Sequence, residues 1–453
     1  MTTAAPIRRP TPMVPPVGMA GPGAPEVVPP PAVPLSFLAA AGVGLVGMGL
    51  ALWFGADRLV ESPTHPGAAS AVHVAMLAFL STAVLGALHQ FAPVVARRPL
   101  RSTRAAWVTL AGWVTTAWLL PSGFAHGPET LVTAGAVIGT LTVGLAAWNL
   151  SGPLSSPDGG VPLWGLRVSV TYLVVTVLFG VVYAFDRQTG WFPLLHHRVL
   201  AHAHLGLLGW LGLTYVSVAE KLWPMFLLAH RPHDHEGRAA VALLATGAAV
   251  LTPGLLFAIA PVAWIGGLLA AAGLCAHLMS LASCVRHRRR RLELLHVYLF
   301  VSAAFLVVGM VLAEVAAVFP LPYAERSNIV SAEIAALAGW LGLAVVGHVH
   351  KIVPFIAYSA LRARGITQGP DGGPLLFGHL YGTGVARGTL GLGTAGFGLV
   401  VAGLLADQPG WLAVGGAALA ACGVGATLNL ALTPRRIIRN HAITQRSAEE
   451  TRP

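Results

Sequence analysis

The chain has 453 residues, of which 55% are hydrophobic and only 10% are charged. This composition excludes a soluble protein of this length and predicts an all-α polytopic membrane protein. The formal net charge of +11 comes mainly from arginines that flank apolar segments, so it indicates membrane topology rather than a nucleic-acid partner.

The N-terminal segment, residues 1–34, contains eleven prolines and predicts a disordered, proline-rich cytoplasmic tail. The apolar run at 35–54 is long for a signal-peptide core and is not followed by a small-x-small cleavage site, so it predicts the first membrane helix. Residues 35–433 predict the membrane domain, and residues 434–453 predict a basic cytoplasmic tail.

Long apolar runs recur along the chain, and a run of about 20 residues is enough to cross a hydrocarbon core of roughly 30 Å. Hydropathy predicts twelve spans, near 35–54, 70–95, 104–122, 130–150, 164–185, 200–228, 239–260, 262–285, 294–319, 330–358, 378–405 and 410–432. The boundary between the seventh and eighth spans is placed at Pro261.

Arginine clusters follow the even-numbered spans, for example Arg97 and Arg98 after the second and Arg288 to Arg291 after the eighth. The intervening loops hold only scattered arginines. Because Lys and Arg accumulate on the cytoplasmic side, this pattern predicts a protein of the bacterial plasma (inner) membrane with both termini in the cytoplasm. The lipid bilayer is then its principal partner.

Three prolines, Pro93, Pro224 and Pro354, close long apolar spans and lie 131 and 130 residues apart. Counting back from each proline, position −3 holds Gln90, Lys221 and Lys351; position −4 holds His89, Glu220 and His350; position −14 holds Phe79, Trp210 and Trp340; and position −20 holds His73, His204 and Ile334. The pentapeptide GWLGL also occurs at both 209–213 and 339–343. This register predicts three four-helix units, roughly 35–150, 164–285 and 294–432, related by a pseudo-threefold axis.

Three histidines lie near the outer ends of two of these spans. His73 and His204 share one register and therefore one depth, whereas His202 and His204 differ in direction by about 200° and should serve two separate sites. Intramembrane ionisable residues usually mark functional sites, and neutral imidazole is a common ligand of metals and haem iron. We expect His73 and His204 to bind one haem iron between them. The alternative is that each histidine only bonds a neighbouring helix.

A second polar set lies at the inner ends of the same spans, about 24 Å farther along the helix. It comprises His89, His348 and His350 together with Glu220, Lys221 and Lys351. This set could be a second haem or metal site, a proton-handling cluster, or simply polar residues at the water interface. In an outer loop, the adjacent His196 and His197 are a candidate copper pair, with solvation as the alternative.

The segment AHAHLGLLGWLGLTYVSVAEKLWPMF, residues 201–226, resembles the tenth helix of the catalytic subunit of haem-copper oxidases, especially C-type cytochrome c oxidases and nitric oxide reductases. In that family a His-x-His motif opens the helix, Gly-Trp-x-Gly follows and a proline closes it. The resemblance implies twelve helices in three pseudo-symmetric sets, a low-spin haem on His204 and His73, and a high-spin haem facing His202. The chain departs from the family because the motif lies in the sixth span and the seventh span has no histidine for copper.

The residues and the resemblance together predict a redox-active, haem-binding membrane protein, with b-type haem and optionally copper. It would transfer electrons, or bind or reduce oxygen or nitric oxide as an oxidoreductase, with a cytochrome or similar electron-donor subunit as partner. Two alternatives stay open. One is a transporter that uses the inner His/Glu/Lys residues, and the other is a non-catalytic, haem-dependent nitric-oxide-response protein.

Overall fold

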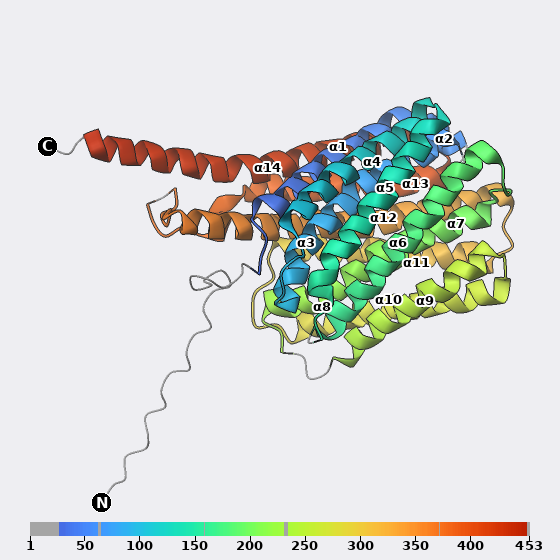
Figure 1. The fold of residues 1–453 in the computed structure, drawn as a ribbon, viewed down its shortest axis with the longest axis horizontal. Helices are drawn as coiled ribbons and strands as arrows, with labels where there is room; N and C mark the ends of the chain where they lie inside the picture. Colours follow the sequence, from blue (N-terminus) through green and yellow to red (C-terminus); the bar gives the residue numbers. More distant parts are fainter. Residues whose placement is uncertain (1–26, 62–64, 158, 231–233, 371, 451–453) are drawn as a thin grey trace, which may run out of the picture.

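A computed structural model describes residues 27–61, 65–157, 159–230, 234–370 and 372–450. Most of the predicted N-terminal tail therefore lies outside the described residues. Within them the backbone forms long helices side by side in an elongated bundle (Figure 1), and the β pairing is limited to one isolated bridge between Gln368 and Pro374. The predicted all-α membrane fold is confirmed.

Among the described residues, eleven helices are long and apolar enough to cross a bilayer. They are Ala32–Glu61 (α1), Pro66–Ala96 (α2 Pro66–His73, η1 Val74–Ser81, α3 Thr82–Ala96), Glu129–Leu154 (α5), Gly160–Thr189 (α6), His196–Leu227 (α7 His196–His204, η2 Leu205–Gly212, α8 Leu213–Leu227), His235–Leu256 (α9), Ala260–Arg286 (α10), Leu294–Val318 (α11), Tyr323–Ala363 (α12), Thr383–Ala406 (α13), and Pro409–Arg435 within α14 (Pro409–Glu450). The helix α4 (Thr103–His126) lies at the predicted third span and completes the twelve, although polar residues make it less apolar than the others.

The helix boundaries refine the sequence predictions at three places. The seventh and eighth spans are separate as predicted, because α9 ends at Leu256 and α10 begins at Ala260. The helix α1 begins at Ala32, so the last residues of the predicted tail are already helical. The predicted C-terminal tail continues α14 as a helix to Glu450, which projects beyond the bundle in Figure 1.

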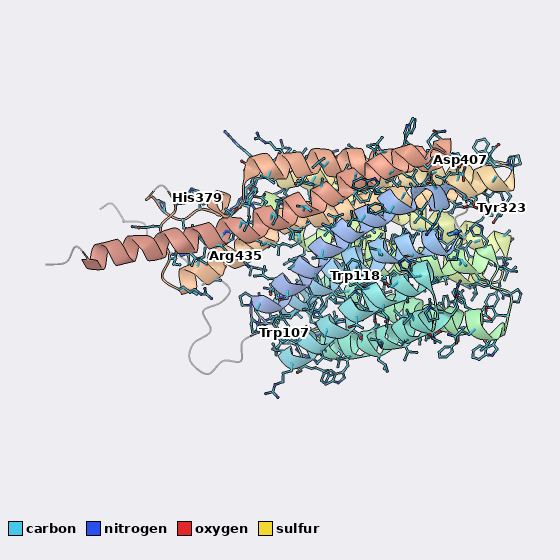
Figure 2. The ribbon with its side chains drawn as sticks, turned by 90° about the horizontal axis from the view of Figure 1, so that it is seen from above. Trp107, Trp118, Tyr323, His379, Asp407 and Arg435 are labelled. Carbon is cyan, nitrogen blue, oxygen red and sulfur yellow. The ribbon has the colours of Figure 1, made fainter. Side chains whose placement is uncertain are left out.

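The two ends of the bundle differ in character. Figure 2 shows Tyr323 and Asp407 at one end and His379 and Arg435 at the other. The arginine-rich connections gather at the second end, where two backbone amides of the 286–291 segment donate to the carbonyl of Leu227 at the end of α8. One end of the bundle is thus strongly basic, as the arginine pattern predicted.

The three proline-closed helices form the core of the bundle. We call Pro66–Ala96, His196–Leu227 and α12 the first, second and third central helices. Their apolar windows are 67%, 61% and 67% buried, whereas those of the other eight candidate spans are 22–50% buried. The remaining helices therefore cover these three and present much of their own surface to the surroundings.

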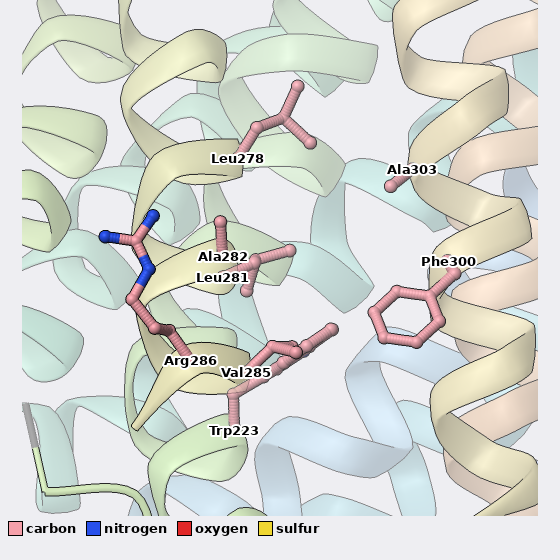
Figure 3. Close-up of a pocket in the computed structure, with 8 residues that line it drawn as sticks. All are labelled: Trp223, Leu278, Leu281, Ala282, Val285, Arg286, Phe300 and Ala303. Atoms are coloured by element: carbon pink, nitrogen blue, oxygen red, sulfur yellow. The ribbon is translucent and has the colours of Figure 1, made fainter. Parts of the chain in front are cut away.

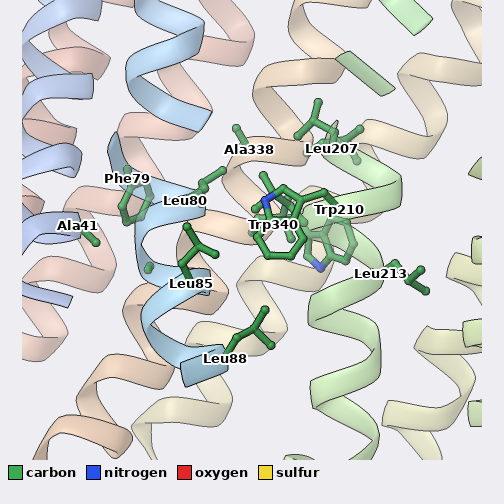
Figure 4. Close-up of a cluster of buried hydrophobic side chains, with 14 of the residues drawn as sticks. Ala41, Phe79, Leu80, Leu85, Leu88, Leu207, Trp210, Leu213, Ala338 and Trp340 are labelled. Carbon is green, nitrogen blue, oxygen red and sulfur yellow. The ribbon is translucent and has the colours of Figure 1, made fainter. Parts of the chain in front are cut away.

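The central helices contact one another at one level, which includes Phe79, Trp210 and Trp340 (Figure 4). Trp210 Nε1 of the second donates to Ser81 Oγ of the first at 3.0 Å. A Cβ added to Gly212 of the second would lie 3.4 Å from the ring of Trp340 in the third. A Cβ added to Gly342 of the third would lie 3.2 Å from the ring of Phe79 in the first.

Each of these three contacts joins an aromatic residue at position −14 to a small residue at position −12 of the next helix. The same pair of positions recurs around the ring, so the predicted repeat has a direct counterpart in the packing. A ring of head-to-tail contacts of this kind is what a pseudo-threefold axis produces.

Replacing Trp210 with alanine should lower the free energy of unfolding by about 3–5 kcal/mol, because it removes a fully buried ring and leaves a cavity at the centre of the bundle. The matched control is Trp411→Ala, since Trp411 is 48% exposed on α14. Thermal unfolding of the detergent-solubilised variants measures the difference. Equal effects of the two substitutions would contradict the central role of this layer.

Candidate functional site

The His-x-His motif at the end of α7 directs its two histidines toward different helices. The ring centroid of His202 lies 6.4 Å from that of His73 in the first central helix. His204 Nε2 instead lies 3.3 Å from Glu333 Oε1 in the third central helix. The structure therefore shows the two separate environments that the spacing predicted.

The histidine pair that the structure brings together differs from the predicted one. The sequence suggested His73 with His204, but the neighbour of His73 is His202. Both ring nitrogens of His204 already have partners, since Nδ1 lies 2.9 Å from the carbonyl oxygen of Leu200 and Nε2 faces Glu333.

The ring of central contacts explains this pairing. Where the second central helix meets the first, Trp210 at −14 contacts Ser81 at −12, which is a shift of two positions. The same shift of two positions places His202, at −22 in the second central helix, beside His73, at −20 in the first. In a cyclic arrangement equivalent positions point toward different neighbours, so His73 and His204, both at −20, do not face each other.

The chemistry of the His73–His202 pair suits a metal between them. His73 Nδ1 lies 2.7 Å from the carbonyl oxygen of Ala69, so the N–H is on Nδ1 and Nε2 keeps its lone pair. His202 Nδ1 is buried and has no hydrogen-bond partner in the described part of the chain. Metal–imidazole bonds of about 2 Å place the centres of two opposing rings about 6 Å apart. The observed centroid separation is 6.4 Å, with the two ring planes inclined by 26°.

Aromatic side chains and a glycine border the pair. The ring of Phe124 lies 5.1 Å from that of His73, and the ring of Tyr183 lies 5.9 Å from that of His202. A Cβ added to Gly180 would lie only 3.4 Å from His202 Cε1.

Two arginines lie near the same outer end. The guanidinium of Arg187 lies 5.1 Å from the ring centre of Phe124, and its Nε donates to Glu129 at 2.7 Å. Tyr183 donates its hydroxyl hydrogen to the carbonyl of Arg198 at 2.9 Å. The Arg187 guanidinium is therefore paired with Glu129, and that of Arg198 donates to the carbonyl of Pro193 at 2.8 Å.

The two central helices that contribute histidines also change their helical geometry at this site. The π-helix η1 begins directly after His73, and the π-helix η2 begins directly after His204. Both cover positions −19 to −12. The third central helix remains α-helical through these positions and has Ile334 at −20. Because π-helical segments are frequently found at functional sites, their presence in these two helices supports a function for this end.

The three predicted inner ligands do not share a site. Their rings contact aromatic residues of different helices, namely His89 with Phe37 of α1 at 5.2 Å, His348 with Tyr215 of α8 at 6.0 Å, and His350 with Tyr298 of α11 at 5.7 Å. In each, Nδ1 bonds the carbonyl four residues earlier, and Nε2 is buried without a partner among the described residues.

The inner charged residues are likewise dispersed. Glu220 accepts a hydrogen bond from Ser280 Oγ of α10 at 2.7 Å. Lys351 donates to Glu293 at the start of α11 at 2.6 Å, and Lys221 is exposed. Glu220 and Lys351 thus bond to different helices, and Lys221 lies at the surface, so the three residues do not form one polar ring.

The predicted copper pair also separates. His196 Nδ1 lies 3.2 Å from the Tyr323 hydroxyl, whereas His197 Nδ1 lies 2.9 Å from the carbonyl oxygen of Leu255. Across the described ranges of the chain, no three His, Cys, Asp or Glu side chains come together in a way that could hold a metal ion.

One polar cluster was missed in the sequence because three separate helices contribute to it. The ring of Tyr215 in α8 stands edge-on to His277 of α10 at 5.6 Å and to His348 of α12 at 6.0 Å. His277 is fully buried, and neither of its ring nitrogens has a partner among the described residues. The sequence feature that indicates this cluster is His277, the lone histidine inside the apolar run of α10.

The chain was compared with protein-family models and with curated proteins, and none of them matches it.

Replacing His277 with leucine should leave the free energy of unfolding unchanged or raise it by about 1–3 kcal/mol, because a buried polar group without a partner is costly. The control is Tyr298→Phe, which removes the hydroxyl that donates to the carbonyl of Ala386 at 2.7 Å and should lower stability. Thermal unfolding in one detergent measures both. A large loss with His277→Leu would show that this imidazole is paired.

Proposed function

We propose that the chain is a haem-binding integral membrane protein that transfers electrons and is related in architecture to the catalytic subunit of haem-copper oxidases. The observation that carries this proposal is the pairing of His73 with His202. Two partly buried imidazoles from different central helices lie with their ring centroids 6.4 Å apart.

Three further features support it. The Nδ1 hydrogen bond to Ala69 leaves the Nε2 lone pair of His73 for iron. The π-helices mark the two copies that carry histidines. The three cysteines, Cys275, Cys284 and Cys422, form no Cys-x-x-Cys-His motif, which favours non-covalent, b-type haem.

The residues around the pair have distinct roles in this proposal. His73 and His202 would hold the haem iron, and the carbonyl of Ala69 orients the first of them. Haem supplies one-electron redox chemistry when bound. With both histidines as ligands, the iron would suit electron transfer better than gas binding.

The position of the pair suggests its electron donor. The arginine-rich end of the bundle corresponds to the cytoplasmic side of a bacterial plasma membrane under the positive-inside rule. His73 and His202 lie toward the opposite end, so an external cytochrome or donor subunit would approach there. Reduction of oxygen or nitric oxide would need a second, open metal site, for which the separated His196 and His197 offer no support.

The other interpretations have weaker support. A transporter would need the inner polar residues to share one site, but they face different helices. A haem-dependent nitric-oxide-response protein would bind the same cofactor, so it differs only in whether the bound iron accepts the gas.

Substitutions within the His-x-His motif test the pairing. Wild-type protein, expressed with haem supplementation, should give a six-coordinate low-spin difference spectrum and a positive pyridine haemochrome assay. His73→Ala and His202→Ala should each abolish the low-spin spectrum, because each removes an axial ligand. His204→Ala is the matched control two residues away, and it should keep the spectrum because His204 bonds Glu333 instead.

The results can contradict the proposal in two ways. A colourless wild-type protein would remove the haem-binding function altogether. Loss of the spectrum with His204→Ala, combined with its retention in His202→Ala, would restore the pairing of His73 with His204. Nitric oxide added to the reduced protein then distinguishes electron transfer, with no spectral change, from gas sensing.

A further inference from the structure

The helices α10 and α11 border an opening in the side of the bundle. The helix α10 packs mainly on α9, and α11 packs mainly on α12. Between α10 and α11 lies a cavity of about 380 Å³, which we call the α10–α11 groove. Figure 3 shows its lining: Leu278, Leu281 and Val285 on α10, Phe300 and Ala303 on α11, and Trp223 of α8. The ring of Phe300 is 40% exposed, so the groove opens toward the lipid.

The polar groups of this lining are hydrogen-bond donors only. They are the indole N–H of Trp223 and the guanidinium of Arg286. Trp223 is 2% exposed, and its side chain also interacts with Tyr215. The lining offers donors but no acceptor side chain, so the groove is chemically suited to a ligand that supplies acceptor oxygens.

The inner end of the groove is also strongly basic. Arg286 is exposed and is followed by the exposed arginines 288–291. None of these arginines forms an ion pair with a described carboxylate, and the nearest acidic residue in sequence, Glu293, is already bonded to Lys351. Two amides of this segment donate to Leu227, which holds the arginines beside the groove.

We propose that the α10–α11 groove binds an anionic phospholipid, with an acyl chain between the two helices and its phosphate among the arginines 286–291. The apolar lining surrounds the acyl chain, and the N–H groups of the arginines donate to phosphate or ester oxygens. The uncompensated positive charge selects an anionic headgroup over a zwitterionic one, as basic pockets between membrane helices do. The proposal is independent of haem binding.

Native mass spectrometry of the full-length protein tests it. The protein, purified in detergent, is incubated with phosphatidylglycerol or with phosphatidylcholine, and the retained lipid is counted. Phosphatidylglycerol should be retained in preference, and Arg286→Gln should weaken its binding about fivefold through the loss of one cation. Arg104→Gln, an exposed arginine on α4, is the matched control and should have no effect. Ala303→Trp should displace the lipid by filling the groove.

Three outcomes would overturn the proposal. Equal retention of the two lipids would remove the anionic selectivity. Equal binding by the Arg286→Gln and Arg104→Gln variants would place the lipid elsewhere. Displacement of phosphatidylglycerol by excess inorganic phosphate would indicate a simple anion site. If Ala303→Trp fails to fold, the surface substitution Arg286→Gln still decides the question.

Discussion

The arrangement of this protein depends on one layer of contacts at the centre of the bundle, where an aromatic ring of each central helix packs on a small residue of the next. A bilayer gives little hydrophobic drive for helices to associate, so close approach over small residues supplies much of the attraction. Gly212 and Gly342 provide that approach, and Ser81 takes the third place while accepting the indole hydrogen of Trp210. Because the three contacts close a ring, they fix the rotation and depth of all three helices together.

The three copies have diverged at their outer ends while keeping this layer. The first and second central helices have histidine at −20 followed by a π-helix, whereas α12 has Ile334 there and remains α-helical. Its neighbouring residue Glu333 instead bonds His204. One side of the second central helix thus meets a histidine, and the other meets a carboxylate. The two sides of the second central helix therefore differ because the three helices are not identical at this end, and the overall fold alone would not make them differ.

The sequence was sufficient for the number of helices, the repeat and the depth of the histidines, because hydropathy, proline register and helix rise are local properties. It was insufficient for the partners of those histidines, which depend on how helices are rotated about the pseudo-threefold axis. His73 and His204 occupy the same position, −20, in two repeated helices. In a cyclic arrangement such equivalent residues point toward different neighbouring helices, so they do not face each other. The Tyr215–His277–His348 cluster was missed for a related reason, since its members come from three helices and share no spacing along the chain.

The unpaired imidazoles at the two ends of the bundle differ in what can satisfy them. Each buried polar atom without a partner costs about 1–3 kcal/mol, and a total stability of about 5–15 kcal/mol can offset only a few of these. At the inner end His89, His348 and His350 lie against different helices, so separate water molecules are enough to pair them. At the outer end the rings of His73 and His202 lie 6.4 Å apart across one helix interface, and His202 Nδ1 is buried without a partner among the described residues. The two-position shift set by the central layer is therefore what brings two imidazoles from different helices together at this end.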